Sequence, residues 1–178
     1  PDAPHREVGG EELVPWFRVL TMSNPHHTRG YVTGTWWLMA QEDKHPGATE
    51  EALGFIDEGI RNNPEQFDLH LMRGRVLMKL ERWVEACDAF REAARLAMKV
   101  RPEGGEPDPS RWSEWEEDDF SAAVHFVSAI TLRRLGDMEA AREALDWAES
   151  ILPGDPRLQR LRVELEQGAP EDESFFAG

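Results

Sequence analysis

The chain has 178 residues and a formal net charge of −15, from 20 basic and 35 acidic side chains. This acidic balance argues against broad binding to nucleic acids or to anionic lipids, because both kinds of binding depend on Lys and Arg. The single cysteine, Cys87, excludes an internal disulfide framework and a cysteine-based zinc site within the chain.

The N-terminal part of the sequence predicts a flexible segment, residues 1–10, followed by helix-forming residues at 11–25. The sequence begins at Pro1 without an initiator methionine, which indicates a processed product or a fragment. Leu13, Phe17 and Leu20 lie at helical spacing, as one face of a helix would place them. No run of 18 or more apolar residues occurs, so the sequence predicts no membrane-spanning segment.

Three later stretches, at about residues 26–64, 65–101 and 113–153, share one pattern of small and large apolar residues. In the second stretch, large apolar residues recur at three- and four-residue steps: Leu69, Met72, Val76, Leu77 and Leu80. After residues 81–82 a new apolar face begins at Trp83, and the small residues Gly74 and Ala86 would let two helices approach closely. Each stretch therefore predicts an antiparallel helical hairpin.

Two further segments complete the expected organisation. Residues 102–112 are rich in Pro, Gly and acidic residues, which predicts an insertion loop, and Ser113 with Glu116 resembles a capping box that starts the next helix. Residues 155–167 predict a polar capping helix whose inward face carries Leu158, Leu161 and Leu165, and residues 168–178 predict a loose acidic tail.

The hairpins resemble the repeats of the tetratricopeptide-repeat (TPR) family, which are helix-turn-helix units of about 34 residues. Gly74, Ala86, Phe90 and Ala93 match the family pattern in the second repeat, and Ala129, Ala141, Ala148 and Pro153 match it in the third. In the first repeat Gly34 and Ala52 are 18 residues apart, against 12 between Gly74 and Ala86, so its turn carries about six extra residues. The resemblance implies an all-α fold: a right-handed α-solenoid of TPR hairpins, with a half-repeat at residues 11–25 and a C-terminal capping helix.

The same resemblance implies a concave groove that is lined by the first helix of each repeat. Carried over by repeat position, the partner-binding residues are Tyr31, Leu38, Leu71, Arg75, Met78, Lys79, Phe126, Ile130, Arg133 and Arg134. Such a groove would be apolar with a basic rim, and would suit a partner peptide or helix with apolar anchors and some negative charge. Leu71 and Phe126 stand where carboxylate-clamp TPR modules carry Lys or Asn, so the resemblance to those modules fails. Trp112 and Trp115, in or beside the insertion, are further predicted partner contacts.

The function that the resemblance implies is a protein–protein interaction scaffold, or an accessory subunit of a larger assembly, with protein partners and no nucleic acid. The motif Glu-Leu-x-Pro-Trp-Phe at residues 12–17 also resembles bacterial TPR proteins that carry an N-terminal membrane anchor. We therefore expect a cytoplasmic or periplasmic location, tethered to a membrane by such an anchor or by a partner. The alternative is a regulatory module that binds a small acidic ligand through Arg75, Lys79, Arg133 and Arg134.

Residues capable of catalysis or metal binding do not form a recognisable pattern. His26 and His27 are adjacent, and neighbouring helical residues do not share a face. The acidic run at residues 114–119 complements the start of a helix and lacks the spacing of a calcium loop. Cys87 is expected to be a small buried side chain. We therefore predict no catalytic residue, no metal ligand and no cofactor; an enzyme with residues too scattered to recognise stays the remaining alternative.

Overall fold

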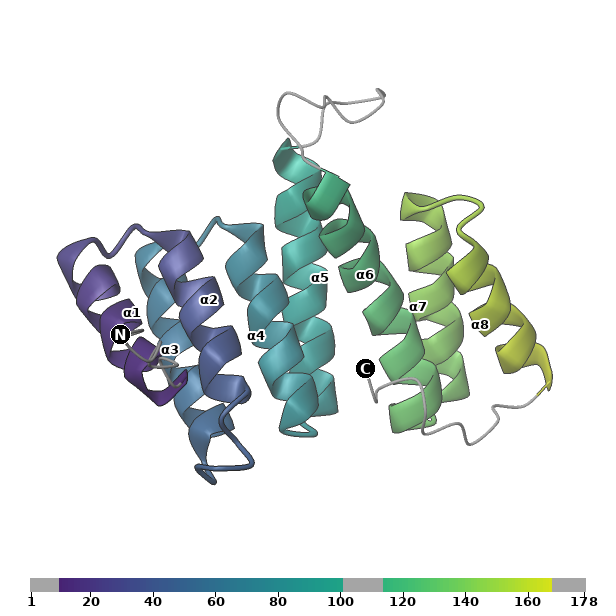
Figure 1. Ribbon diagram of the computed structural model, residues 1–178. Coiled ribbons are helices and arrows are strands. Elements are labelled where there is room, and N and C mark those ends of the chain that lie inside the picture. Colours follow the sequence, from purple (N-terminus) through teal and green to yellow (C-terminus); the bar gives the residue numbers. More distant parts are fainter. Residues whose placement is uncertain (1–9, 101–113, 168–178) are drawn as a thin grey trace, which may run out of the picture.

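The computed structural model describes the backbone of residues 10–100 and 114–167, and all regular secondary structure in these two ranges is helical (Figure 1). The predicted loop at 102–112 and tail at 168–178 lie outside these ranges, as do residues 1–9. The helices are α1 (Gly10–Ser23), α2 (Thr28–Met39), α3 (Ala48–Asn62), α4 (Phe67–Lys79), α5 (Trp83–Val100), α6 (Glu114–Ile130), α7 (Met138–Ile151) and α8 (Pro156–Gln167). None of them, within the described ranges, is both long and apolar enough to cross a bilayer.

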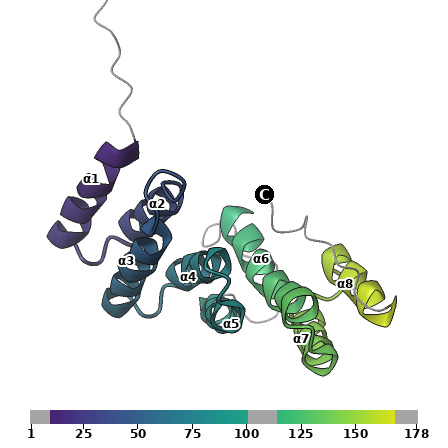
Figure 2. The same cartoon turned by 90° about the horizontal axis from the view of Figure 1, so that it is seen from below.

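The helices form three hairpins, α2/α3, α4/α5 and α6/α7, which stack into an elongated row (Figures 1 and 2). Helix α1 packs on α2 at one end of the row, and α8 packs on α7 at the other. The first helices of successive hairpins also touch, because α2 contacts α4 and α4 contacts α6, and α6 in turn contacts the last helix, α8. The expected all-α solenoid of TPR-like hairpins is confirmed.

Each of the first two hairpins interlocks where a glycine of one helix meets an aromatic ring of the other. A Cβ atom added to Gly74 in α4 would lie 2.5 Å from the Phe90 ring of α5, and one added to Gly34 in α2 would lie 2.5 Å from the Phe55 ring of α3. Phe90 and Phe55 are at most 1% exposed. The rings therefore occupy space that any side chain at these glycines would need, which sets the separation of the paired helices.

We expect Gly74→Ala to lower the free energy of unfolding by about 1–3 kcal/mol, because the added methyl group must displace the Phe90 ring in a close-packed core. Gly54→Ala is the matched control, since Gly54 is also helical but no heavy atom lies within 4 Å of its added Cβ. This control should raise the free energy of unfolding by about 0.5–1 kcal/mol, through a less flexible unfolded chain and better helix propensity. Urea unfolding of both variants tests the pair, and equal effects would contradict the close packing.

The end of α6 differs from a regular helix. It continues into a π-helical turn, η1 (Thr131–Leu135), and then stops at Gly136, whose φ of 65° is left-handed. The Thr131 hydroxyl donates a hydrogen bond of 2.7 Å to the carbonyl oxygen of Val127, a side-chain to backbone bond of the kind that perturbs helices. Asp137 then caps α7, because its Oδ1 accepts hydrogen bonds from the N–H groups of Glu139 and Ala140.

Candidate functional site

Four of the predicted groove residues are buried: Tyr31, Leu38, Leu71 and Ile130 are at most 7% exposed. The physical reason is packing inside the array: Tyr31 and Leu38 lie in a core cluster with residues of α3 and α4, and Leu71 and Ile130 lie in one that joins α4, α5, α6 and α7. Tyr31 packs beside Phe55, with ring centroids 5.0 Å apart, and Leu71 belongs to the core cluster that contains Phe90. Their expected place in an open groove is therefore corrected, since their side chains contribute to packing within the array.

The remaining predicted residues of α4 are partly or fully exposed, and Arg75 lies at the contact of α4 with α6. Arg75 Nη2 lies 2.8 Å from Asp119 Oδ1 of α6. Met78 and Phe126 are half-buried and both pack against the same core cluster. Lys79 is exposed, and its Nζ donates a hydrogen bond of 2.8 Å to the carbonyl oxygen of Met39. Lys79 therefore lies toward α2. We call the other four side chains, Arg75, Met78, Asp119 and Phe126, the α4–α6 patch.

The two predicted basic residues of the third repeat also have partners inside the array. Arg133 is bidentate to Glu164 of α8, with Nε–Oε2 at 3.0 Å and Nη2–Oε1 at 2.6 Å. The guanidinium carbon of Arg134 lies 5.1 Å from the centre of the Trp83 ring. Each basic residue of the expected rim thus has a partner within the array: a carboxylate for Arg75 and Arg133, a backbone carbonyl for Lys79 and an aromatic ring for Arg134.

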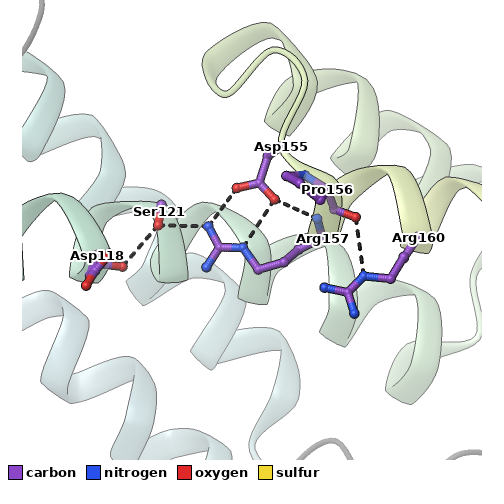
Figure 3. A network of polar contacts seen from close by, with 6 residues as sticks. All are labelled: Asp118, Ser121, Asp155, Pro156, Arg157 and Arg160. Atoms are coloured by element: carbon purple, nitrogen blue, oxygen red, sulfur yellow. Dashed lines mark hydrogen bonds and ion pairs between the residues drawn. The ribbon is translucent and has the colours of Figure 1, made fainter.

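A polar network joins α8 to α6 and holds the capping helix in place (Figure 3). Arg157 Nη2 donates to Asp155 Oδ2 at 2.6 Å and to Ser121 Oγ at 2.9 Å, and Ser121 Oγ donates to the carbonyl oxygen of Asp118 at 3.2 Å. The hydrogen bonds from the Arg157 guanidinium hold the pKa of the Asp155 carboxyl below its ordinary value. The network therefore serves the stability of the C-terminal end of the array.

Cys87 and the histidine pair have structural surroundings. Cys87 is 3% exposed, and burial raises the pKa of its thiol, which disfavours the reactive thiolate. The His27 ring nitrogen Nδ1 accepts a hydrogen bond of 3.0 Å from the Gly30 N–H at the start of α2, so His27 is a helix cap. His26 Nδ1 lies 3.1 Å from Asn63 Oδ1. Over residues 10–100 and 114–167, no three His, Cys, Asp or Glu side chains gather as metal ligands would.

Several large apolar side chains near the start of the array are exposed. Trp16, Val19 and Met22 of α1 are 69%, 55% and 77% exposed, and they follow one another at three-residue steps. Trp36 of α2 is 55% exposed, whereas its neighbour Trp37 is half-buried, with the two rings edge to face at 5.3 Å. We call Trp16, Val19, Met22 and Trp36 the exposed apolar set. Of the two tryptophans predicted beside the insertion, Trp112 and the side chain of Trp115 lie outside the described residues.

One cleft was not anticipated from the sequence. It lies between α1, the end of α2 and the start of α3, and comprises two adjoining cavities of about 370 and 150 Å³ that share Val14, Leu38 and Glu51. Gln41 and His45 from the α2–α3 turn, and Arg18 from α1, also line it. We call it the first-repeat cleft. The signal for it in the sequence was the lengthened turn of the first repeat, whose spacing shows extra residues but not where they pack.

Three of the solved structures to which this structure is similar illustrate its fold. The thermophilic TPR protein TTC0263 from Thermus thermophilus gives a TM-score of 0.56 at 20% sequence identity, over 89% of this chain and 72% of that protein. The protein MamA gives 0.63 at 14% identity, over 89% and 78%. YrrB, described as a TPR protein with an unusual peptide-binding site, gives 0.55 at 17% identity, over 85% and 66%. No family model and no curated protein matches the sequence.

Proposed function

Because the chain has the tetratricopeptide-repeat fold, we propose that it is a protein–protein interaction scaffold or an accessory subunit of a larger assembly. The observation that carries this proposal is the exposed apolar set of α1 and α2, with two tryptophans more than half exposed. Exposed aromatic side chains of this size are typical anchors for a protein partner. The tether to a membrane that the N-terminal motif suggests stays a prediction.

Within the array we place a partner segment on the α4–α6 patch. Met78 and Phe126 offer it apolar contacts, and Arg75 and Asp119 already neutralise each other across 2.8 Å. A partner that binds here would depend on apolar burial more than on charge, so its affinity should tolerate salt. The partners of Lys79, Arg133 and Arg134 within the array weigh against the alternative of a small acidic ligand, which needs available positive charge.

The proposal includes no catalytic step by this chain. The residue with the greatest intrinsic nucleophilicity, Cys87, is buried with a raised pKa, and its Sγ lies 3.9 Å from the carbonyl oxygen of Val127. Three solved structures to which the chain is similar share its fold, and that fold presents an extended surface. Interaction is therefore the role that the architecture favours.

The experiment that tests this function is affinity capture with the purified full chain from native extract, followed by size-exclusion chromatography with light scattering. Two variants, Trp16→Glu and Met78→Glu, place a charge on the exposed apolar set and on the α4–α6 patch. Val163→Glu is the matched control, because Val163 is an apolar residue of α8 that is 49% exposed.

We expect the wild-type chain to capture one stoichiometric partner, and the complex to survive a salt concentration of about 0.5 M, since apolar burial is screened little by salt. Trp16→Glu and Met78→Glu should each weaken this binding by about 10-fold, and Val163→Glu should leave it unchanged. A chain that captures no partner, or the same partner equally with all variants, would sink the proposal.

A further inference from the structure

The lengthened turn between α2 and α3 is an ordered structure that builds one wall of the first-repeat cleft. The carboxylate of Glu42 accepts hydrogen bonds from the N–H groups of Gly47, at 3.0 Å, and Thr49, at 2.6 Å. The carbonyl oxygen of Gln41 accepts two more, from the N–H groups of Lys44 and His45 at 2.9 and 2.8 Å. Gly47 supplies the left-handed φ of 96° that directs the chain into α3. The extra residues are therefore held in one conformation.

The walls of the cleft are mainly apolar. Val14 and Pro15 of α1, Leu38 of α2 and Ala48 of α3 line it, and its two cavities measure about 370 and 150 Å³. Three helices and the turn border this cleft, and its lining residues Pro15, Arg18, His45 and Glu51 are exposed, so the cleft is open to solvent. An aliphatic chain would be partly covered on entering it.

Two polar groups in the cleft can accept hydrogen bonds from a ligand, one buried and one exposed. Gln41 is 7% exposed, and its Oε1 accepts no hydrogen bond from any residue that the structure describes. A buried carboxamide oxygen without a donor is costly, so it favours a ligand that donates. Glu51 lines both cavities, and among the described residues no cation lies within ion-pair distance of its carboxylate.

The one arginine that lines the described part of the cleft does not compensate Glu51. Arg18 Nη1 lies 2.6 Å from Glu58 Oε2, and its guanidinium carbon lies 4.6 Å from the centre of the Phe55 ring. Its charge is therefore already matched by a different carboxylate. What the described lining offers a ligand is an apolar surface with one carboxamide, one carboxylate, the Arg18 guanidinium and the His45 imidazole, in a chain whose net charge is −15.

We propose that the first-repeat cleft is a receptor for a lysine side chain of a partner protein. The four methylene groups would lie against Val14, Leu38 and Ala48, and the ammonium group would donate to the exposed Glu51 carboxylate and, once the Gln41 carboxamide turns toward the cleft, to its buried Oε1. A compact ammonium with three donors suits these two separate acceptors better than the planar fork of arginine, which prefers a single carboxylate. This inference rests on the proposed function, because it takes the ligand to be part of a bound protein.

The test uses the full chain and two small probes, N-acetyl-lysine N-methylamide and N-acetyl-norleucine N-methylamide, which differ by the ammonium group. Binding is followed by chemical-shift changes in two-dimensional amide NMR spectra. Two variants are compared. Glu51→Gln removes the carboxylate of the cleft, and Glu50→Gln removes a neighbouring carboxylate that is likewise exposed and in the first turn of α3 but is not among the residues that line the cleft. Because both substitutions remove one charge near the same helix start, they control for global charge and folding.

We expect the lysine probe to shift the amide signals of residues 41–51 in a saturable way, and the norleucine probe to bind at least about five-fold more weakly. Glu51→Gln should weaken binding of the lysine probe by about five-fold, and Glu50→Gln should leave this binding unchanged. Equal binding of the two probes, equal effects of the two variants, or shifts elsewhere only would overturn the lysine receptor. Failure of the lysine receptor can be distinguished from failure of the proposed function. If the wild-type chain and Glu51→Gln capture the same partner equally well, the lysine receptor is refuted and the scaffold is not. If the wild-type chain captures no partner, the scaffold itself is refuted.

Discussion

Replacement of Phe90 by alanine is expected to lower the free energy of unfolding by about 3–5 kcal/mol, because the ring is fully buried and its removal leaves a cavity. Phe90 contacts the first helix of its own hairpin through Gly74 and the third repeat through Phe126, whose ring centroid is 5.1 Å away. The variant therefore loosens two adjoining units of the array. Urea unfolding followed by far-UV circular dichroism measures the change.

Two further variants define the origin of this effect. Val84→Ala, at a position of the same helix that is 61% exposed, should change the free energy of unfolding by no more than about 0.5 kcal/mol. In the Phe90→Ala background the Gly74→Ala substitution should become neutral or stabilising, because the atoms with which the new methyl group would collide are gone. If the double variant loses the sum of the free energies of unfolding that the two single variants lose, the contact between Gly74 and Phe90 does not set the packing of this hairpin.

Stability is expected to fall steeply with acid below neutral pH, because of His125. This residue is 6% exposed in α6, and burial, together with the positive charge of Arg157, lowers the pKa of its imidazole to about 4. Arg133 and Arg160 lower it further, while Asp155 opposes them. Its ordinary value of about 6.5 applies to the unfolded chain. Between these two values the unfolded chain binds the extra proton, so stability decreases as the pH falls through this window.

The size of this effect follows from the two pKa values. Above about pH 6.5 the imidazole of His125 is neutral in both states and does not lower the free energy of unfolding. Between pH 7 and pH 5 its titration lowers the free energy of unfolding by about 2 kcal/mol, and below pH 4 the total loss reaches about 3 kcal/mol. The measurement is urea unfolding at a series of pH values for the wild type and for His125→Gln, which does not titrate. We expect the variant to lose stability more gently over pH 7 to 5. Parallel curves for the two proteins would show that the imidazole titrates in the folded chain as it does in the unfolded one.

The fold could be predicted because its determinants are local. The apolar spacing of Leu69, Met72 and Val76, and the small residue Gly74 opposite Phe90, follow from a helical period and from the volume of side chains. The structure confirms an array of helical hairpins built on these residues. The π-helical turn at Thr131 was not predicted, because a single hydroxyl bound to a carbonyl leaves no periodic signal.

The candidate site was less predictable, because exposure depends on neighbouring hairpins. Leu71 and Ile130 occupy groove positions by repeat register, yet both are buried in a core cluster that joins α4, α5, α6 and α7. Arg75 and Arg133 look like available cations in the sequence, but their carboxylate partners, Asp119 and Glu164, are 44 and 31 residues away. Repeat position alone cannot show such pairs, since it describes one unit at a time.

By itself the sequence determined the helical period, the pairing of small residues with large ones and the lengthened first turn, since each is set by residues near one another in the chain. Only the tertiary structure decided which side chains stay exposed, how the basic residues are neutralised, and that the lengthened turn encloses a cleft with Gln41 and Glu51. The physical reason is that burial and ion pairing depend on distances between helices of different repeats, and those distances exist only once the hairpins have stacked.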